Sequence, residues 1–236
     1  MKAIQASFFQ MTMILRRDMM LFVCCLAPIP AGFFFRFAIP FLESLLTEGF
    51  HREAILSPYY KLMDILFAVL SPALFCFVSA MVSLEEADEK TAVYLFVTPL
   101  TKTGYLAARF GLPSAAAFFA TCLLLPVFKL TALSPLILFL LAAGGALQGM
   151  IVALLVITIS SNKLEGMAAA KLSMLTVFGA AIPFFLRSNL QYFLSPLPAF
   201  WIGKAVLQDS PLFMLPALVL SALWICVLLK GYLRKA

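Results

Sequence analysis

Charged side chains are scarce in this chain of 236 residues, because Asp, Glu, Lys and Arg together make up only 12% of the sequence. Hydrophobic residues make up 64%, and the mean hydropathy is +1.04. This composition excludes a soluble globular protein and indicates an integral membrane protein. Since a membrane-spanning helix needs about 20 apolar residues, six spans would use about half of the chain and leave no room for a sizeable soluble domain.

Sequence motifs of catalysis are lacking as well. The sequence has no G-x-x-x-x-G-K-[ST] phosphate-binding loop, no G-x-S-x-G and no H-E-x-x-H. Its one histidine, His51, has no second histidine or nearby cysteine with which to hold a metal ion. The five cysteines all lie inside apolar runs, where a thiol acts as a small hydrophobic group. We therefore expect no catalytic, cofactor or metal site, and any use of ATP would depend on a partner chain.

The excess of basic residues gives a net charge of +6. In a membrane protein such residues set the orientation and face anionic lipid, so we interpret them as contacts with the lipid bilayer and not with nucleic acid. With both termini in the cytoplasm, 11 of the 17 basic residues fall in cytoplasmic segments. Most of the other six are single residues near span ends, from which long side chains can reach the headgroups. The six are Arg36, Arg52, Lys61, Lys129, Arg187 and Lys204.

The hydropathy pattern predicts one all-α transmembrane domain, 1–236, with six transmembrane helices. The polar stretch 43–57 is expected to lie along the outer membrane interface. The region 187–209 contains Pro196 and Pro198 and is too interrupted for a clean crossing, which indicates a re-entrant segment. The predicted order is an N-terminal amphipathic interfacial helix (1–18), spans one and two (19–84), a cytoplasmic loop (85–104), spans three to five (105–186), the re-entrant segment (187–209), and span six with the tail (210–236).

The most informative stretch runs from Ser83 to Arg109. It begins with an acidic cluster that hydrocarbon could not accommodate, continues as a short amphipathic helix, and stops at a Thr-Pro pair before the third span. Two interpretations are open. The stretch is either an ordinary interfacial loop or a coupling helix that docks into a groove on an ATPase.

This stretch resembles the loop between spans two and three of the ABC-2 family of exporter permeases, which has an acidic start, an aliphatic helix, a Thr-Pro pair and a Tyr-Leu pair. The matching residues are Glu86, Glu89, Thr91, Leu95, Thr98, Pro99, Leu100, Tyr105 and Leu106. Residues 162–171 look like the N-K-x-E-G-x-A-x-x-K loop of drug-exporting members, and residues 195–201 look like their proline-rich re-entrant segment. The haem-exporter membrane subunit is a similar six-span protein, and a membrane assembly protein without transport activity is a further alternative.

The resemblance implies the ABC-2 exporter fold and a permease subunit in the bacterial cytoplasmic membrane. Such a subunit moves an amphipathic, drug-like, peptide or lipid-like substrate out of the cell. It would work with two copies of a separate ABC ATPase subunit and with a second permease, either another copy of itself or a homologue. The residues then expected to couple the membrane domain to the ATPase are Glu85, Glu86, Glu89, Thr91, Leu95, Phe96, Thr98 and Pro99.

Three polar residues within the spans are candidates for a substrate path. Arg36 either reaches the outer headgroups or faces the path as a cation paired with Asp64. Gln148 lies between Gly145 and Gly149, which form a G-x-x-x-G pattern that permits close helix approach. We expect this pattern to pack inside one subunit rather than between two, and the Gln148 amide to hydrogen-bond across helices.

Overall fold

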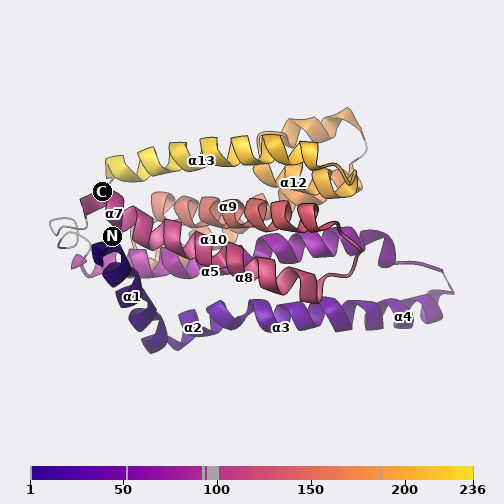
Figure 1. The fold of residues 1–236 in the computed structure, drawn as a ribbon, viewed down its shortest axis with the longest axis horizontal. Coiled ribbons are helices and arrows are strands. Elements are labelled where there is room, and N and C mark those ends of the chain that lie inside the picture. The colour runs from indigo at the N-terminus through magenta and orange to yellow at the C-terminus, as the bar shows by residue number, and fades with distance from the viewer. Residues whose placement is uncertain (1, 52, 92–93, 95–100, 187, 236) are drawn as a thin grey trace.

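The computed structural model describes residues 2–51, 53–91, 94, 101–186 and 188–235, and these residues form a helical bundle (Figure 1). Six stretches in them are long and apolar enough to cross a membrane, so the predicted all-α, six-span fold is confirmed. The stretches are Met19–Phe50, Ser57–Asp88, Thr101–Phe128, Pro135–Ile159, Lys163–Phe185 and Pro211–Arg234.

Several spans are built from more than one helical segment. The first follows α1 (Lys2–Arg17) and comprises α2 (Met19–Leu26), α3 (Pro28–Phe33), the π-helical turn η1 (Phe34–Ala38) and α4 (Ile39–Phe50). The second comprises η2 (Ser57–Tyr59) and α5 (Tyr60–Asp88), and the third comprises α7 (Thr101–Leu106), the π-helical turn η3 (Ala107–Gly111) and α8 (Leu112–Phe128). The fourth is α9 (Pro135–Ile159), and the fifth comprises α10 (Lys163–Met174), η4 (Leu175–Ala181) and α11 (Ile182–Phe185). Then follow η5 (Asn189–Leu194), α12 (Pro198–Leu207), and the sixth span with η6 (Pro211–Phe213) and α13 (Met214–Lys235).

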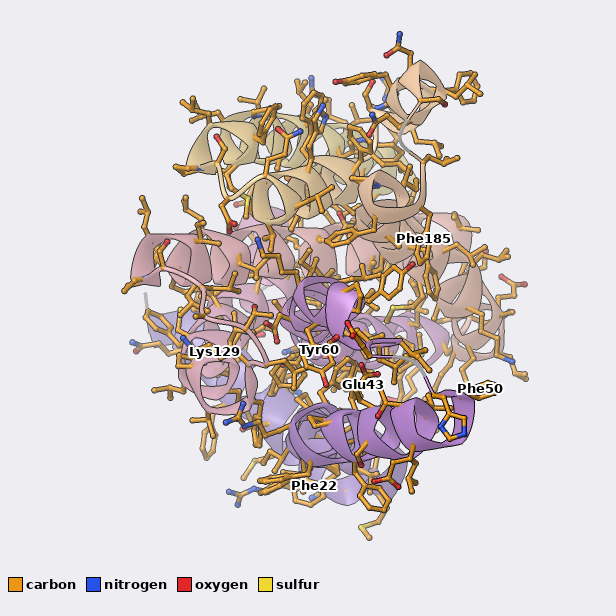
Figure 2. All side chains as sticks on the ribbon, turned by 90° about the vertical axis from the view of Figure 1, so that its right-hand side faces the viewer. Phe22, Glu43, Phe50, Tyr60, Lys129 and Phe185 are labelled. Carbon is orange, nitrogen blue, oxygen red and sulfur yellow. The ribbon has the colours of Figure 1, made fainter. Side chains whose placement is uncertain are left out.

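The second and fourth spans form the centre of the bundle. In the most apolar part of each, 72% of the residues are buried, against 17% in the first span. Figure 1 shows α2 to α4 along one side of the bundle, α13 along the opposite side, and both termini at the same end. The peripheral helices expose apolar side chains such as Phe22 and Phe50 (Figure 2), which a bilayer would cover.

The contact between α5 and α9 depends on the G-x-x-x-G pattern. Pro72 lies inside α5 and has no N–H to give to the carbonyl of Ala68, four residues earlier. Gly145 packs against that carbonyl so closely that a Cβ on the glycine would lie 2.2 Å from the Ala68 oxygen. A Cβ on Gly149 would lie 2.8 Å from the Pro72 oxygen. The pattern therefore packs inside one subunit, as expected.

The ends of the first span differ from the hydropathy boundaries. The chain is extended at Asp18, which separates α1 from α2, and the span's last helix continues to Phe50. It stops at His51, which has a left-handed backbone conformation with φ of 50°. Much of the stretch predicted to lie along the interface, 43–57, is thus a continuation of the first span, and Figure 1 shows α4 extending beyond the neighbouring helices. The membrane positions of α1 and α12 stay predictions.

Glu43 fixes the connection from the first span to the second. Its carboxylate accepts hydrogen bonds from the backbone N–H groups of Ile55 (3.0 Å), Leu56 (2.6 Å) and Ser57 (3.2 Å). These are donors at the start of a helix, which lack partners within it. In Figure 2 Glu43 lies on the side of α4 that faces Tyr60, the first residue of α5. The carboxylate therefore holds the beginning of the second span against the first.

Candidate functional site

A buried ion pair lies at the end of the bundle that carries both termini. Glu86, near the end of α5, is 4% exposed, and Arg109, in the π-helical turn η3, is 0% exposed. The Arg109 guanidinium donates through Nε to Glu86 Oε2 at 3.0 Å and through Nη2 to Glu86 Oε1. The Tyr105 hydroxyl donates to the same carboxylate at 2.8 Å. The chain itself therefore supplies both the positive charge and the hydrogen-bond donors that this buried carboxylate needs.

The same arginine attaches the N-terminal helix. Arg109 Nη1 donates to the backbone carbonyl of Ser7, in α1, at 2.7 Å. A guanidinium has five N–H donors in a fixed plane, which lets one side chain bind a carboxylate bidentately and a carbonyl as well. Arg109 therefore joins α1 to the second and third spans, and π-helical turns such as η3 are frequent at functional sites.

Lys163 forms a second junction at the start of the fifth span. Its ammonium donates to Asp18 Oδ2 at 3.0 Å and to Glu85 Oε2 at 2.9 Å, and its backbone N–H donates to Asp88 Oδ2 at 2.9 Å. Asp18 also caps α2 by accepting from the N–H groups of Met20 and Leu21. The Lys163 hydrogen bond lowers the pKa of the Asp18 carboxyl below its ordinary value and outweighs the opposing effect of partial burial.

An open groove of about 660 Å³ lies between α1, the start of α2 and the end of α5, and we call it the elbow groove. Its walls combine apolar side chains with four carboxylates and one arginine. The lining residues are Gln10, Ile14, Arg17, Asp18, Met19, Met20, Val82, Glu85, Glu86, Glu89 and Thr91. The groove is large enough to receive several side chains of another molecule.

The structure separates the predicted coupling residues into three groups. Glu85 and Glu86 are engaged in the two junctions, and Glu86 is buried among them. Glu89 is exposed on the rim of the elbow groove, and Thr91 donates to the Glu86 carbonyl at 3.1 Å. Leu95, Phe96, Thr98 and Pro99 lie outside the described residues. Their role in coupling, like that of the others, stays a prediction.

Arg36 and Asp64 do not pair with each other; both bind the connection between the third and fourth spans. Arg36 Nη1 donates to the Lys129 carbonyl at 2.7 Å. Asp64 accepts from the N–H groups of Leu130 (2.7 Å) and Thr131 (2.9 Å) and from the Thr131 hydroxyl (2.5 Å). Asp64 is buried, and it accepts from backbone N–H groups of the loop that follows α8, which would otherwise lack partners. The Arg36–Asp64 pair, one of the two alternatives for Arg36, is therefore not formed, and each side chain contacts the same loop instead.

Gln148 is fully buried, and its Nε2 donates to the Thr176 hydroxyl in η4 at 2.9 Å. This is the hydrogen bond across helices that the sequence predicted, and it joins the fourth span to the fifth. A role of Gln148 in a substrate path stays a prediction.

Residues 12–230 match the family described as Rv2686c-like fluoroquinolones export permease proteins. The chain belongs to this family. Two relatives, each named fluoroquinolones export permease protein, come from the CDC 1551 / Oshkosh and H37Rv strains of Mycobacterium tuberculosis. Each is 28% identical to the chain over 196 residues, which cover 80% of this chain and 75% of the relative. No solved structure matches the chain.

Membership of the fluoroquinolones export permease family is consistent with the resemblance to ABC-2 exporter permeases. It favours a drug-exporting permease over a haem-exporter subunit or an assembly protein, because both relatives carry export permease names.

In this family member the two junctions place Ser7, Asp18, Tyr105 and Arg109 beside the predicted acidic cluster. Sequence analysis missed this arrangement, although a signal was present. Arg109 falls inside the predicted third span, where a charge needs a partner.

Proposed function

We propose that the chain is the membrane subunit of an ATP-driven exporter that moves an amphipathic, drug-like substrate out of a bacterial cell. The observation that carries this proposal is the family match over residues 12–230. The names of the two relatives make fluoroquinolones the first substrates to test. Energy would come from a separate ATPase subunit in two copies, since the sequence has no phosphate-binding loop. A second permease copy or a homologue would complete the assembly.

The two junctions support a mechanism for coupling. An ATPase docked at the elbow groove would push on α1 or on the end of α5. Arg109 would pass this movement to the third span through the Ser7 carbonyl, and Lys163 would pass it to the fifth span through Asp18 and Glu85. In this proposal the two junctions transmit the movement, while the exposed rim of the groove recognises the ATPase.

Glu89 offers a test of docking at this rim. Because Glu86 is part of a buried ion pair, reversing its charge would disturb the fold and could not report on docking alone. Glu89→Lys changes an exposed charge, which is worth about 0–1 kcal/mol, so we expect ATPase retention on the purified permease to fall about two- to fivefold. Co-purification of the permease with the proposed ATPase subunit measures the effect.

Glu48→Lys is the matched control, since Glu48 is also an exposed glutamate but lies on α4, at the other end of the bundle. It should leave ATPase retention unchanged. Equal retention by the two variants, together with unchanged transport, would reduce the acidic rim to a solvated turn.

A further inference from the structure

Lys204 lies buried among aromatic rings at the end of the bundle away from both termini. It belongs to α12, is 5% exposed, and donates to the Tyr192 hydroxyl at 2.5 Å. Its ammonium is 4.2 Å from the centroid of the Tyr192 ring, 5.1 Å from Phe213, 5.6 Å from Trp201 and 5.9 Å from Phe200. The sequence predicted that this lysine would reach the headgroups, but its side chain points into an aromatic enclosure, which we call the Lys204 cage.

The Lys204 cage has no negative charge to balance the ammonium. Among the described residues no carboxylate lies within ion-pair distance of Lys204, and the carboxylate of nearby Asp209 binds Lys61 at 2.5 Å instead. Aromatic faces attract a cation but only partly replace its hydration. Of the three N–H donors of the ammonium, one has the Tyr192 hydroxyl as acceptor. The cage therefore favours an anionic acceptor at the position of that hydroxyl.

The segment that carries Tyr192 is lightly held. Phe193, next to it in η5, is 86% exposed, and Leu190 is 75% exposed, so this short helix packs little of its apolar surface against the rest of the protein. The chain is anchored just beyond η5, where Trp201 Nε1 donates to the Ser195 carbonyl at 2.8 Å and Trp224 Nε1 donates to the Pro196 carbonyl at 3.0 Å. Tyr192 can thus leave the cage while both anchors stay in place, because segments with few buried contacts open at low cost.

We infer that the Lys204 cage is a binding site for the carboxylate of a planar aromatic acid, whose place the Tyr192 hydroxyl takes in this structure. The ammonium would donate charge-assisted hydrogen bonds to the carboxylate. Trp201 and Phe213, whose rings are nearly parallel at 18° and 6.2 Å apart, would contact the flat ring of the acid. The role of this site in export rests on the proposed function, and it would make the substrate class aromatic carboxylates.

Binding of two matched probes tests the site without transport. 2-Naphthoate carries the carboxylate, and 2-naphthamide has the same ring with a neutral group. We expect calorimetry on the purified full chain in detergent, corrected with empty micelles, to show naphthoate binding at least tenfold tighter than naphthamide. Lys204→Met should abolish this preference, and Lys204→Arg should keep it. Tyr192→Phe should strengthen naphthoate binding, because it removes the competing hydroxyl, whereas loss of a purely structural contact would not.

Lys129→Met is the matched control, since it removes a lysine at the same end of the bundle (Figure 2) that lies outside the cage and leaves the Lys61–Asp209 ion pair intact. It should keep the tenfold preference. Equal affinity of the wild-type chain for the two probes, or a preference that survives in Lys204→Met, would overturn the inference. The wild-type comparison needs no variant and therefore stands even if a substitution prevents folding. The binding assay contains no ATPase and is independent of the export assay. If the complex exports substrate but the purified chain shows no preference for naphthoate, this site is rejected and the proposed function stands. If the purified chain shows the preference but the complex does not export substrate, the proposed function is rejected and the site stands.

Discussion

Replacing Arg109 by methionine is expected to lower the free energy of unfolding by about 3–5 kcal/mol. The substitution leaves the buried Glu86 carboxylate with a hydrogen bond from the Tyr105 hydroxyl but without its positive charge, and it removes the donor to the Ser7 carbonyl. An unpaired charge in a site that excludes water is far more costly than the pair itself. Thermal and denaturant unfolding of the purified chain in detergent, followed by circular dichroism, measures the loss.

Two further variants distinguish the contribution of the buried Glu86–Arg109 pair to stability from that of a more exposed ion pair. Lys163→Met removes a lysine whose side chain is 27% exposed, so about 0–1 kcal/mol should be lost for each of its ion pairs. The double variant Glu86→Leu with Arg109→Met removes both buried charges and should recover at least about 2 kcal/mol relative to Arg109→Met. If Arg109→Met were no less stable than Lys163→Met, the junction would not hold α1 and the spans together as described.

Gly145→Ala is expected to destabilise the bundle by about 1–3 kcal/mol, because the added methyl group would force α9 away from α5. Its Cβ would lie 2.2 Å from the Ala68 carbonyl oxygen, which is backbone and cannot rotate aside. These two helices form the centre of the bundle, so the displacement would reach the other spans. The same unfolding measurement in detergent reports the change.

Gly111→Ala is the matched control for this prediction. Gly111 is also helical, and a Cβ there has no atom within 4 Å. Replacement of such a glycine by alanine stabilises by about 0.4–1 kcal/mol through the unfolded chain. Similar stability of the two variants would show that the close approach of α9 to α5 is not required.

The spans were predictable because hydrophobic runs of sufficient length have few alternatives to a membrane helix. Their ends were less predictable, since local backbone geometry sets them and hydropathy does not. The first span continues past the predicted apolar run until the left-handed conformation of His51 ends it. The third span begins at Thr101, four residues before the predicted Tyr105.

The polar contacts show what the sequence could not specify. An acidic cluster indicates a membrane boundary, but it does not tell which carboxylate faces inward, and here Glu86 is buried while Glu89 is exposed. Arg36 and Asp64 have opposite charges, yet both bind the chain at 129–131, because the backbone groups of this loop also need partners. Lys204 is buried because four aromatic rings from three separate segments surround it. These four residues lie close to Lys204 in the sequence, but a hydropathy pattern does not show that their rings turn toward one ammonium.

Substrate export from proteoliposomes tests the central claim most directly. The purified chain alone should neither hydrolyse ATP nor export a fluoroquinolone above background, since it has no phosphate-binding loop. Adding the proposed ATPase subunit, together with ATP, should raise export well above that background. Export driven by an ion gradient in the absence of any ATPase would contradict the account and place the protein among the secondary transporters.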